Sequence, residues 1–168
     1  TPFSLVISYR GNPLYQPSPY TGFVDHLGLH YPDGNSIFAV AEPDGARYWF
    51  PANDHPRDKA TYRFEILVPE GLVAVANGRL IDQRPAALPG GDLGNLFVWE
   101  HEFPMAPYLA LVAVGPYERI DGQTAAGIPL RHYALPEQRQ EILEVAAEAG
   151  AALDWMASLF GAYPFESF

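Results

Sequence analysis

Proline is the sequence feature that most restricts the fold of this chain. The 168 residues include 17 prolines, and from Pro2 to Pro136 no two successive prolines lie more than 16 positions apart. An internal proline removes a helical hydrogen bond and clashes with the preceding turn. Long helices are therefore excluded from this part, and the gaps suit short strands joined by turns. Residues 137–163 are the one proline-free stretch long enough for a helix of about six turns.

Before Ala134 the apolar residues follow the two-residue period of strands. Phe3, Leu5, Ile7 and Tyr9 alternate with smaller or polar residues, which predicts a first strand over 3–10. Two turn signals, Pro32-Asp33-Gly34-Asn35 and Asn77-Gly78, predict hairpins. Residues 85–94, rich in proline and glycine, predict a mobile loop. The further strands are expected at 22–31, 36–41, 60–68, 72–76, 79–83, 95–102, 108–115 and 127–133.

After Pro136 the apolar spacing changes to that of a helix. Apolar residues recur every three or four positions, at Ile142, Ala146, Ala149, Leu153, Met156 and Phe160. This predicts a helix over 137–160 that ends at Gly161. The pattern therefore predicts a mainly β fold class, an antiparallel all-β domain to about Ala134 followed by one C-terminal α-helix. We expect a β domain over 1–134 and the start of another unit over 135–168.

Composition excludes several classes of function. The formal net charge is −10, and Lys59 is the single lysine, so a nucleic-acid partner, which needs a basic face, is not expected. No apolar run approaches the ~18 residues of a membrane span. Cysteine is absent, which removes disulfides, thiolate metal sites and cysteine nucleophiles.

Residues able to carry catalysis are not apparent in this sequence. The five histidines include no HExxH pair. Glu100-His101-Glu102 is expected to be a solvated strand edge rather than a ligand set. No phosphate-binding glycine loop and no G-x-S-x-G elbow is present. We therefore predict no catalytic residue and no metal ligand in this segment.

The segment 42–59 combines three aromatic and seven charged residues in a long connection between strands. Long loops with such content are often functional. Glu42 follows the apolar strand 36–41, and Pro43 favours an extended backbone that holds the carboxylate at the rim of the sheet. Spacing alone favours a solvated loop acid over a binding residue. Arg47 and Asp54 are expected to pair across the turn and to pin the loop.

The same segment resembles a known family. Residues 42–61 read Glu-Pro-x-x-Ala-Arg-x-x-Phe-Pro-x-x-Asp-x-Pro-x-x-Lys-Ala-Thr, which is similar to the N-terminal domain of the aminopeptidase N family of zinc metallopeptidases. Further similar segments follow in the same order: Met105–Ala110, Val114–Glu118, Ile128–Glu137 and Leu159–Phe165.

The resemblance implies a β saddle laid against a thermolysin-like catalytic domain, which would begin at about residue 135 and be truncated here. It implies that Glu42 accepts hydrogen bonds from the free α-ammonium of a peptide substrate. Many members carry Gln two residues before this Glu, and Val40 stands there in this chain, which suggests a more apolar wall. The family's zinc ligands, in HExxH and a later Glu, are not found in these residues. Zinc is expected in the full-length parent, and the 168-residue segment is expected to hold none and to be inactive.

Three interpretations remain open from the sequence. The first is a fragment of a zinc aminopeptidase, whose partners are peptides with a free N-terminus and the missing catalytic domain of the same chain. The second is a non-catalytic scaffold with the same fold. The third is a free-standing β-sandwich binding module. The apolar face of the helix 137–160 should also need cover, either by folding back on the β domain or, as we favour, by self-association with another copy.

Overall fold

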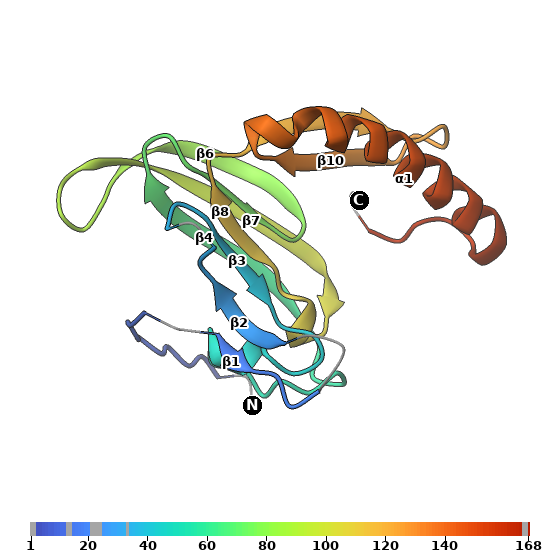
Figure 1. Ribbon diagram of the computed structural model, residues 1–168. Coiled ribbons are helices and arrows are strands. Elements are labelled where there is room, and N and C mark those ends of the chain that lie inside the picture. Colours follow the sequence, from blue (N-terminus) through green and yellow to red (C-terminus); the bar gives the residue numbers. More distant parts are fainter. Residues whose placement is uncertain (1–2, 13–14, 21–24, 33, 166–167) are drawn as a thin grey trace.

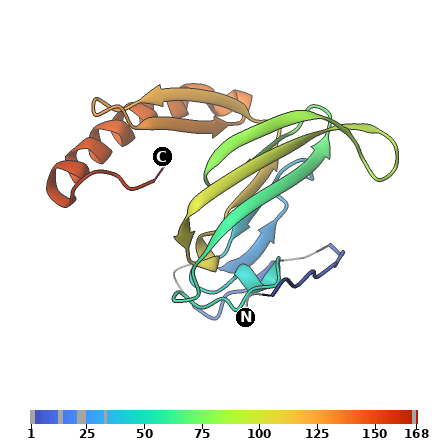
Figure 2. The same cartoon turned by 180° about the vertical axis from the view of Figure 1, so that it is seen from behind.

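Two antiparallel sheets packed face to face form the body of the molecule in a computed structural model (Figures 1 and 2). It describes residues 3–12, 15–20, 25–32, 34–165 and 168. The five-stranded sheet has the order β1 (Gln16–Pro17), β2 (His26–His30), β3 (Ile37–Val40), β8 (Val112–Gly115) and β5 (Val73–Ala76). The three-stranded sheet has the order β4 (Ala60–Pro69), β7 (Leu93–Met105) and β6 (Arg79–Ala87). The predicted mainly β fold with antiparallel pairing is confirmed.

The core lies between these two sheets. Its buried residues are contributed by both: Val68, Phe97 and Trp99 from the three-stranded sheet, and Ala74, Ala76 and Val114 from the five-stranded sheet. Trp99 is almost fully buried, and its indole Nε1–H donates to the carbonyl oxygen of Ala74 at 3.0 Å. This bond satisfies the one polar atom of the indole inside the core and ties the sheets together.

The Asn77-Gly78 turn is not a hairpin, which corrects the sequence prediction. The strand before it, β5, pairs with β8, whereas the strand after it, β6, pairs with β7. The turn therefore carries the chain from one sheet to the other. Gly78 has φ 88°, and a Cβ there would overlap the carbonyl of Glu100. Only glycine fits this close approach of two backbones.

The strand predicted over 3–10 is also wrong for its described residues. Residues 3–12 have no strand, and Phe3, Leu5 and Val6 are largely exposed. An alternating segment forms a strand only where a neighbour supplies hydrogen bonds, and no segment in the described part of the chain pairs with residues 3–12. The expected hairpin of 22–31 with 36–41 is confirmed as β2 and β3, with Leu29 opposite Ala39; residues 22–24 and 33 lie outside the described part.

The loop predicted over 85–94 is shorter than expected. Strand β6 continues to Ala87, strand β7 begins at Leu93, and Leu88 N–H donates to Asp92 O at 2.9 Å across the turn between them. Pro85 is tolerated because β6 is the edge strand of its sheet. The region 108–115 likewise begins with the short 3₁₀ helix η2 (Pro107–Leu109) before β8.

A hairpin and a helix form a separate layer at one end of the sheets (Figure 1). The hairpin is β9 (Glu118–Gln123), which the sequence analysis missed, with β10 (Pro129–Ala134). After the 3₁₀ helix η3 (Pro136–Gln138), helix α1 (Arg139–Phe160) packs on this hairpin through Gly150 and Leu153. The Asp154 carboxylate accepts the backbone N–H groups of Ala125 and Ala126 at 2.8 and 3.3 Å, which fixes the hairpin turn to the helix.

The predicted apolar face of the helix is therefore only partly covered. Leu153 is buried and Ile142 is half-buried, but Met156 and Phe160 are exposed. Trp155 and Leu159 are exposed as well. Helix α1 thus folds back on the hairpin along one side and presents a second, apolar side to solvent.

Phe168 lies beside β10. Its N–H donates to Pro129 O at 3.0 Å, and its carbonyl accepts Arg131 N–H at 2.8 Å. Phe168 thus bonds to the residues on both sides of Leu130, which lies opposite it. This pattern is that of a parallel pair.

Candidate functional site

The candidate site lies where the chain leaves strand β3. Glu42 is exposed, two residues after the last residue of that strand. Its carboxylate makes no hydrogen bond or ion pair within the described residues. The peptide bond between Glu42 and Pro43 is cis. Val40, the last residue of β3 and two positions before Glu42, is half-buried. The arrangement offers a solvent-facing carboxylate at a strand end.

The backbone under Glu42 is held tightly. Ala41 is buried, and its carbonyl accepts Gly45 N–H at 2.6 Å. Gly45 packs directly over Leu27 of β2, where a Cβ would stand 2.8 Å from the Cβ of Leu27. This distance is shorter than any normal carbon contact, so the close approach needs glycine. The segment then forms the 3₁₀ helix η1 (Ala46–Tyr48).

Arg47 and Asp54 form the ion pair that their spacing suggested. Asp54 Oδ2 accepts the backbone N–H of Arg47 at 3.1 Å and its side-chain Nε–H at 3.2 Å. The Asp54 side chain is 1% exposed, whereas that of Arg47 is 49% exposed. Asp54 has φ 52°, a left-handed conformation that Asp tolerates better than most residues. The pair closes the loop from residue 47 to residue 54.

The electrostatics of the loop centre on Arg47. The hydrogen bond to Asp54 raises the pKa of Arg47 above its ordinary value, and the negative charges of Asp54 and Asp44 act in the same direction. Asp44 Oδ2 lies 3.6 Å from Arg47 Nη2. One guanidinium thus partly neutralises two carboxylates, while Glu42 has no cation of its own among the described residues.

The aromatic residues of the loop have a packing role. Trp49 and Phe50 meet edge to face with ring centroids 4.5 Å apart. Phe50 meets Tyr62 of β4 at 6.5 Å, and Tyr62 stacks on Phe64 at 5.6 Å. These contacts anchor the loop to the three-stranded sheet. A hollow of about 660 Å³ on this side is lined by Tyr9–Asn12, Leu29 and Arg47–Pro51, without Glu42.

The described residues do not provide a metal site. No three His, Asp or Glu side chains in the described part of the chain are arranged to hold an ion. His101, expected at a solvated edge, is instead 5% exposed and contacts Phe103 and Phe165. Its neighbours Glu100 and Glu102 do face solvent and pair with Arg63 and Arg79. The period-two pattern of β7 could have shown this, because it places His101 on the same face as Trp99.

Asn77 is a positioning residue that the sequence analysis did not identify. Its side-chain Nδ2–H donates to Leu109 O at 3.1 Å, and its Oδ1 accepts Leu111 N–H at 2.6 Å. It therefore fixes the connection between η2 and β8, which runs beside the end of β3. The Asn-Gly pair was a turn signal, but the long-range clamp depends on contacts more than 30 residues away.

Comparison with protein-family models identifies the N-terminal part of the chain. Residues 1–109, which include β3 and the loop after it, match the Peptidase M1 N-terminal domain. The chain belongs to the M1 peptidase family. The resemblance inferred from the motif at 42–61 is thereby confirmed.

Relatives of this M1 chain are aminopeptidases. It is 34% identical to the puromycin-sensitive aminopeptidase of Caenorhabditis elegans over 118 residues. This alignment covers 68% of this chain and 12% of that protein. It is 26% identical over 161 residues to the glutamyl aminopeptidase of Bos taurus, covering 95% of this chain and 16% of that protein. The chain therefore spans a small part of the length of these relatives.

Solved M1 structures share the fold. The zinc metallopeptidase of Deinococcus radiodurans, solved with a Tyr-Ser-Ala substrate, superposes with TM-score 0.71 at 26% identity over 94% of this chain and 35% of that one. Aminopeptidase A of Legionella pneumophila, in complex with aspartic acid, also gives TM-score 0.71 at 26% identity, over 84% of this chain and 17% of that one. Within the described residues, no helix has the length and apolar character needed to cross a membrane.

Proposed function

We propose that this chain is the β domain of a zinc aminopeptidase and that Glu42 binds the free α-ammonium of the peptide substrate. The observation that carries the proposal is an exposed carboxylate, without a cation among the described residues, at the end of a strand in an M1 N-terminal domain. A carboxylate that accepts a hydrogen bond from an ammonium group forms a charge-assisted bond, about twice as strong as a neutral one. Such a contact rewards an uncapped N-terminus and favours an exopeptidase.

Two neighbouring features support the same role. The Arg47–Asp54 pair and the Gly45–Leu27 contact hold the backbone that carries Glu42, which lowers the entropic cost of placing its carboxylate. Val40 supplies an apolar wall where a polar residue is common in the family.

In this proposal zinc is bound by the full-length parent and not by the residues of this segment. The described residues of this chain do not fit a zinc site, and the sequence has no HExxH. In the parent, a zinc ion would activate water for attack on the peptide carbonyl. We propose that residues 135–168 begin the domain that holds it. The 168-residue segment alone should hold no stoichiometric zinc and cleave no aminoacyl reporter.

The test is substrate kinetics of the full-length parent with Glu42→Ala and Glu42→Gln. Loss of a charged hydrogen bond worth about 1.5–3 kcal/mol should lower kcat/KM for free-amine substrates by about 10- to 150-fold. Glu42→Gln should lose less because its carbonyl still accepts a hydrogen bond. Glu70→Ala, at an exposed turn after β4, is the matched control. Equal kinetics for Glu42→Ala and the wild type, within about twofold, would contradict the role.

A further inference from the structure

The Asn77-Gly78 pair has the chemistry of a deamidation site. A side-chain amide of asparagine is open to attack by the backbone nitrogen of the next residue, and glycine hinders this attack least because it has no side chain. The pair lies where the chain passes from the five-stranded to the three-stranded sheet. Asn77 is partly exposed, so water reaches it. The sequence and the solvent contact that deamidation needs are therefore both present.

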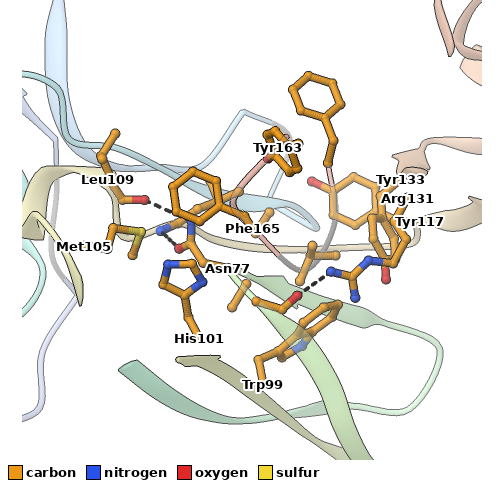
Figure 3. Close-up of a pocket in the computed structure, with 16 residues that line it drawn as sticks. Asn77, Trp99, His101, Met105, Leu109, Tyr117, Arg131, Tyr133, Tyr163 and Phe165 are labelled. Atoms are coloured by element: carbon orange, nitrogen blue, oxygen red, sulfur yellow. Dashed lines mark hydrogen bonds between the residues drawn. The ribbon is translucent and has the colours of Figure 1, made fainter. Parts of the chain in front are cut away.

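The Asn77 side chain is held at both of its polar atoms (Figure 3). Its Nδ2–H donates to Leu109 O at 3.1 Å, and its Oδ1 accepts Leu111 N–H at 2.6 Å. Attack on the amide requires the reacting atoms to meet in the correct orientation. The side chain can turn toward the backbone nitrogen of Gly78 only by breaking these two hydrogen bonds, which together we call the Asn77 clamp.

The backbone of Gly78, which carries the attacking nitrogen, is fixed as well. Gly78 has φ 88°, and a Cβ on it would overlap Glu100 O and stand 2.8 Å from the Cα of His101. Its carbonyl accepts a hydrogen bond from the Arg131 guanidinium. Gly78 therefore cannot move far without separating from β7. In the folded chain both reacting groups are held in place.

From these observations we propose that Asn77 is a latent deamidation site, which the clamp closes and which opens when the connection between η2 and β8 separates from it. In the open state the Gly78 nitrogen attacks Asn77 Cγ, the Cγ–Nδ2 bond breaks, and ammonia leaves with the proton of the Gly78 N–H. Water then opens the cyclic imide. Cleavage of the ring bond to Cγ leaves aspartate at position 77, and cleavage of the ring bond to the main-chain carbonyl carbon leaves isoaspartate.

Neither product restores the Asn77 clamp. Aspartate has no Nδ2–H and places a second acceptor against Leu109 O. Isoaspartate in addition lengthens the main chain by a carbon beside Glu100, where the backbones are too close even for a Cβ. A molecule that has reacted therefore stays loosened between η2 and β8. This site does not depend on the role of Glu42.

The experiment incubates the 168-residue chain at mildly alkaline pH, in buffer and in guanidinium chloride. Trypsin then releases residues 64–79, in which Asn77 is the single side-chain amide. Mass spectrometry gives the fraction of this peptide in which the amide has become an acid, and chromatography separates aspartate from isoaspartate. Deamidation should be at least about tenfold slower in the folded chain than in the unfolded one, because the rate follows the population of the open state.

Leu111→Pro tests the clamp without changing Asn77. It removes the N–H that donates to Asn77 Oδ1, and Ala110 already has the extended backbone, φ −63° and ψ 118°, that a residue before proline adopts. This variant should deamidate at least about fivefold faster than the wild type in buffer and equally fast in guanidinium chloride. Leu111→Ala keeps the N–H and is the matched control, which should react like the wild type in both.

A third variant, Asn77→Asp, reproduces one product and should unfold at a lower urea concentration than the wild type. The proposal is overturned if the folded wild type deamidates as fast as the unfolded chain, or if Asn77→Asp is as stable as the wild type. It is equally overturned if Leu111→Pro, folded by circular dichroism, reacts no faster than Leu111→Ala. The first two comparisons decide the proposal even where Leu111→Pro does not fold.

Discussion

Removing the carboxylate of Asp54 should measure how firmly the loop after β3 is held. In Asp54→Ala, the backbone N–H of Arg47 loses a charged acceptor worth about 1.5–2 kcal/mol. The bond to the half-exposed Arg47 side chain adds little because water screens it. Ala at φ 52° adds about 1–2 kcal/mol of backbone strain. The expected loss in the free energy of unfolding is therefore about 2.5–4 kcal/mol.

Asp54→Asn separates these contributions. Asn tolerates the left-handed backbone and keeps one oxygen acceptor, so the expected loss is only about 1–2 kcal/mol. Urea unfolding of both variants gives the free energies, and amide hydrogen exchange gives the local effect. The Arg47 amide should exchange about 30-fold faster for each 2 kcal/mol lost locally.

The control is Asp58→Ala, which removes an exposed carboxylate from the same loop and should change stability by less than about 0.5 kcal/mol. The reasoning is refuted if Asp54→Ala falls within that range as well. It is also refuted if Asp54→Asn is as destabilising as Asp54→Ala, because charge alone would then explain the effect.

Four further predictions follow from single features. Leu153→Ala should cost about 2–5 kcal/mol in urea unfolding, because it empties the contact between α1 and the hairpin. Gly78→Ala should abolish folding as judged by circular dichroism, whereas Gly90→Ala, with open space around it, should be nearly neutral. Burial raises the pKa of Tyr133 above its ordinary value of 10, so the folded state favours the protonated phenol. The free energy of unfolding should therefore fall as pH rises from about 10 through the raised pKa. Absorbance titration of the wild type and of Tyr133→Phe checks this. We propose that α1 self-associates, and light scattering at high concentration should show dimers that Trp155→Glu reduces; a monomeric wild type contradicts this.

Local sequence patterns were sufficient to predict the structure where it depends on residues that are close together in the chain. The alternation in 60–68 predicted β4, because Phe64, Ile66 and Val68 face the core. The spacing after Pro136 predicted α1. The seven-residue separation of Arg47 and Asp54 predicted an ion pair that a single turn can close. The motif at 42–61 predicted the family.

Patterns failed where partners lie far along the chain. Asn77-Gly78 has the local chemistry of a hairpin, but β5 and β6 find their partners in different sheets. The alternation in 3–10 has no paired neighbour among the described residues. Strand β9 was missed because Ile120 is its single buried residue, which leaves no alternation to detect.

Strand β8 has a consequence for the order in which the chain can fold. It lies between β3 and β5 and pairs Val114 with Ile37 on one side and with Ala74 on the other. During synthesis from the N-terminus, β3 and β5 are complete well before β8 leaves the ribosome. Until then both present open edges, which are the usual templates for aggregation. Closure of the five-stranded sheet must therefore wait for β8, and it is slow because the pairing of Ile37 with Val114 spans 77 positions. A nascent chain arrested before Val112 should need a chaperone to stay in solution.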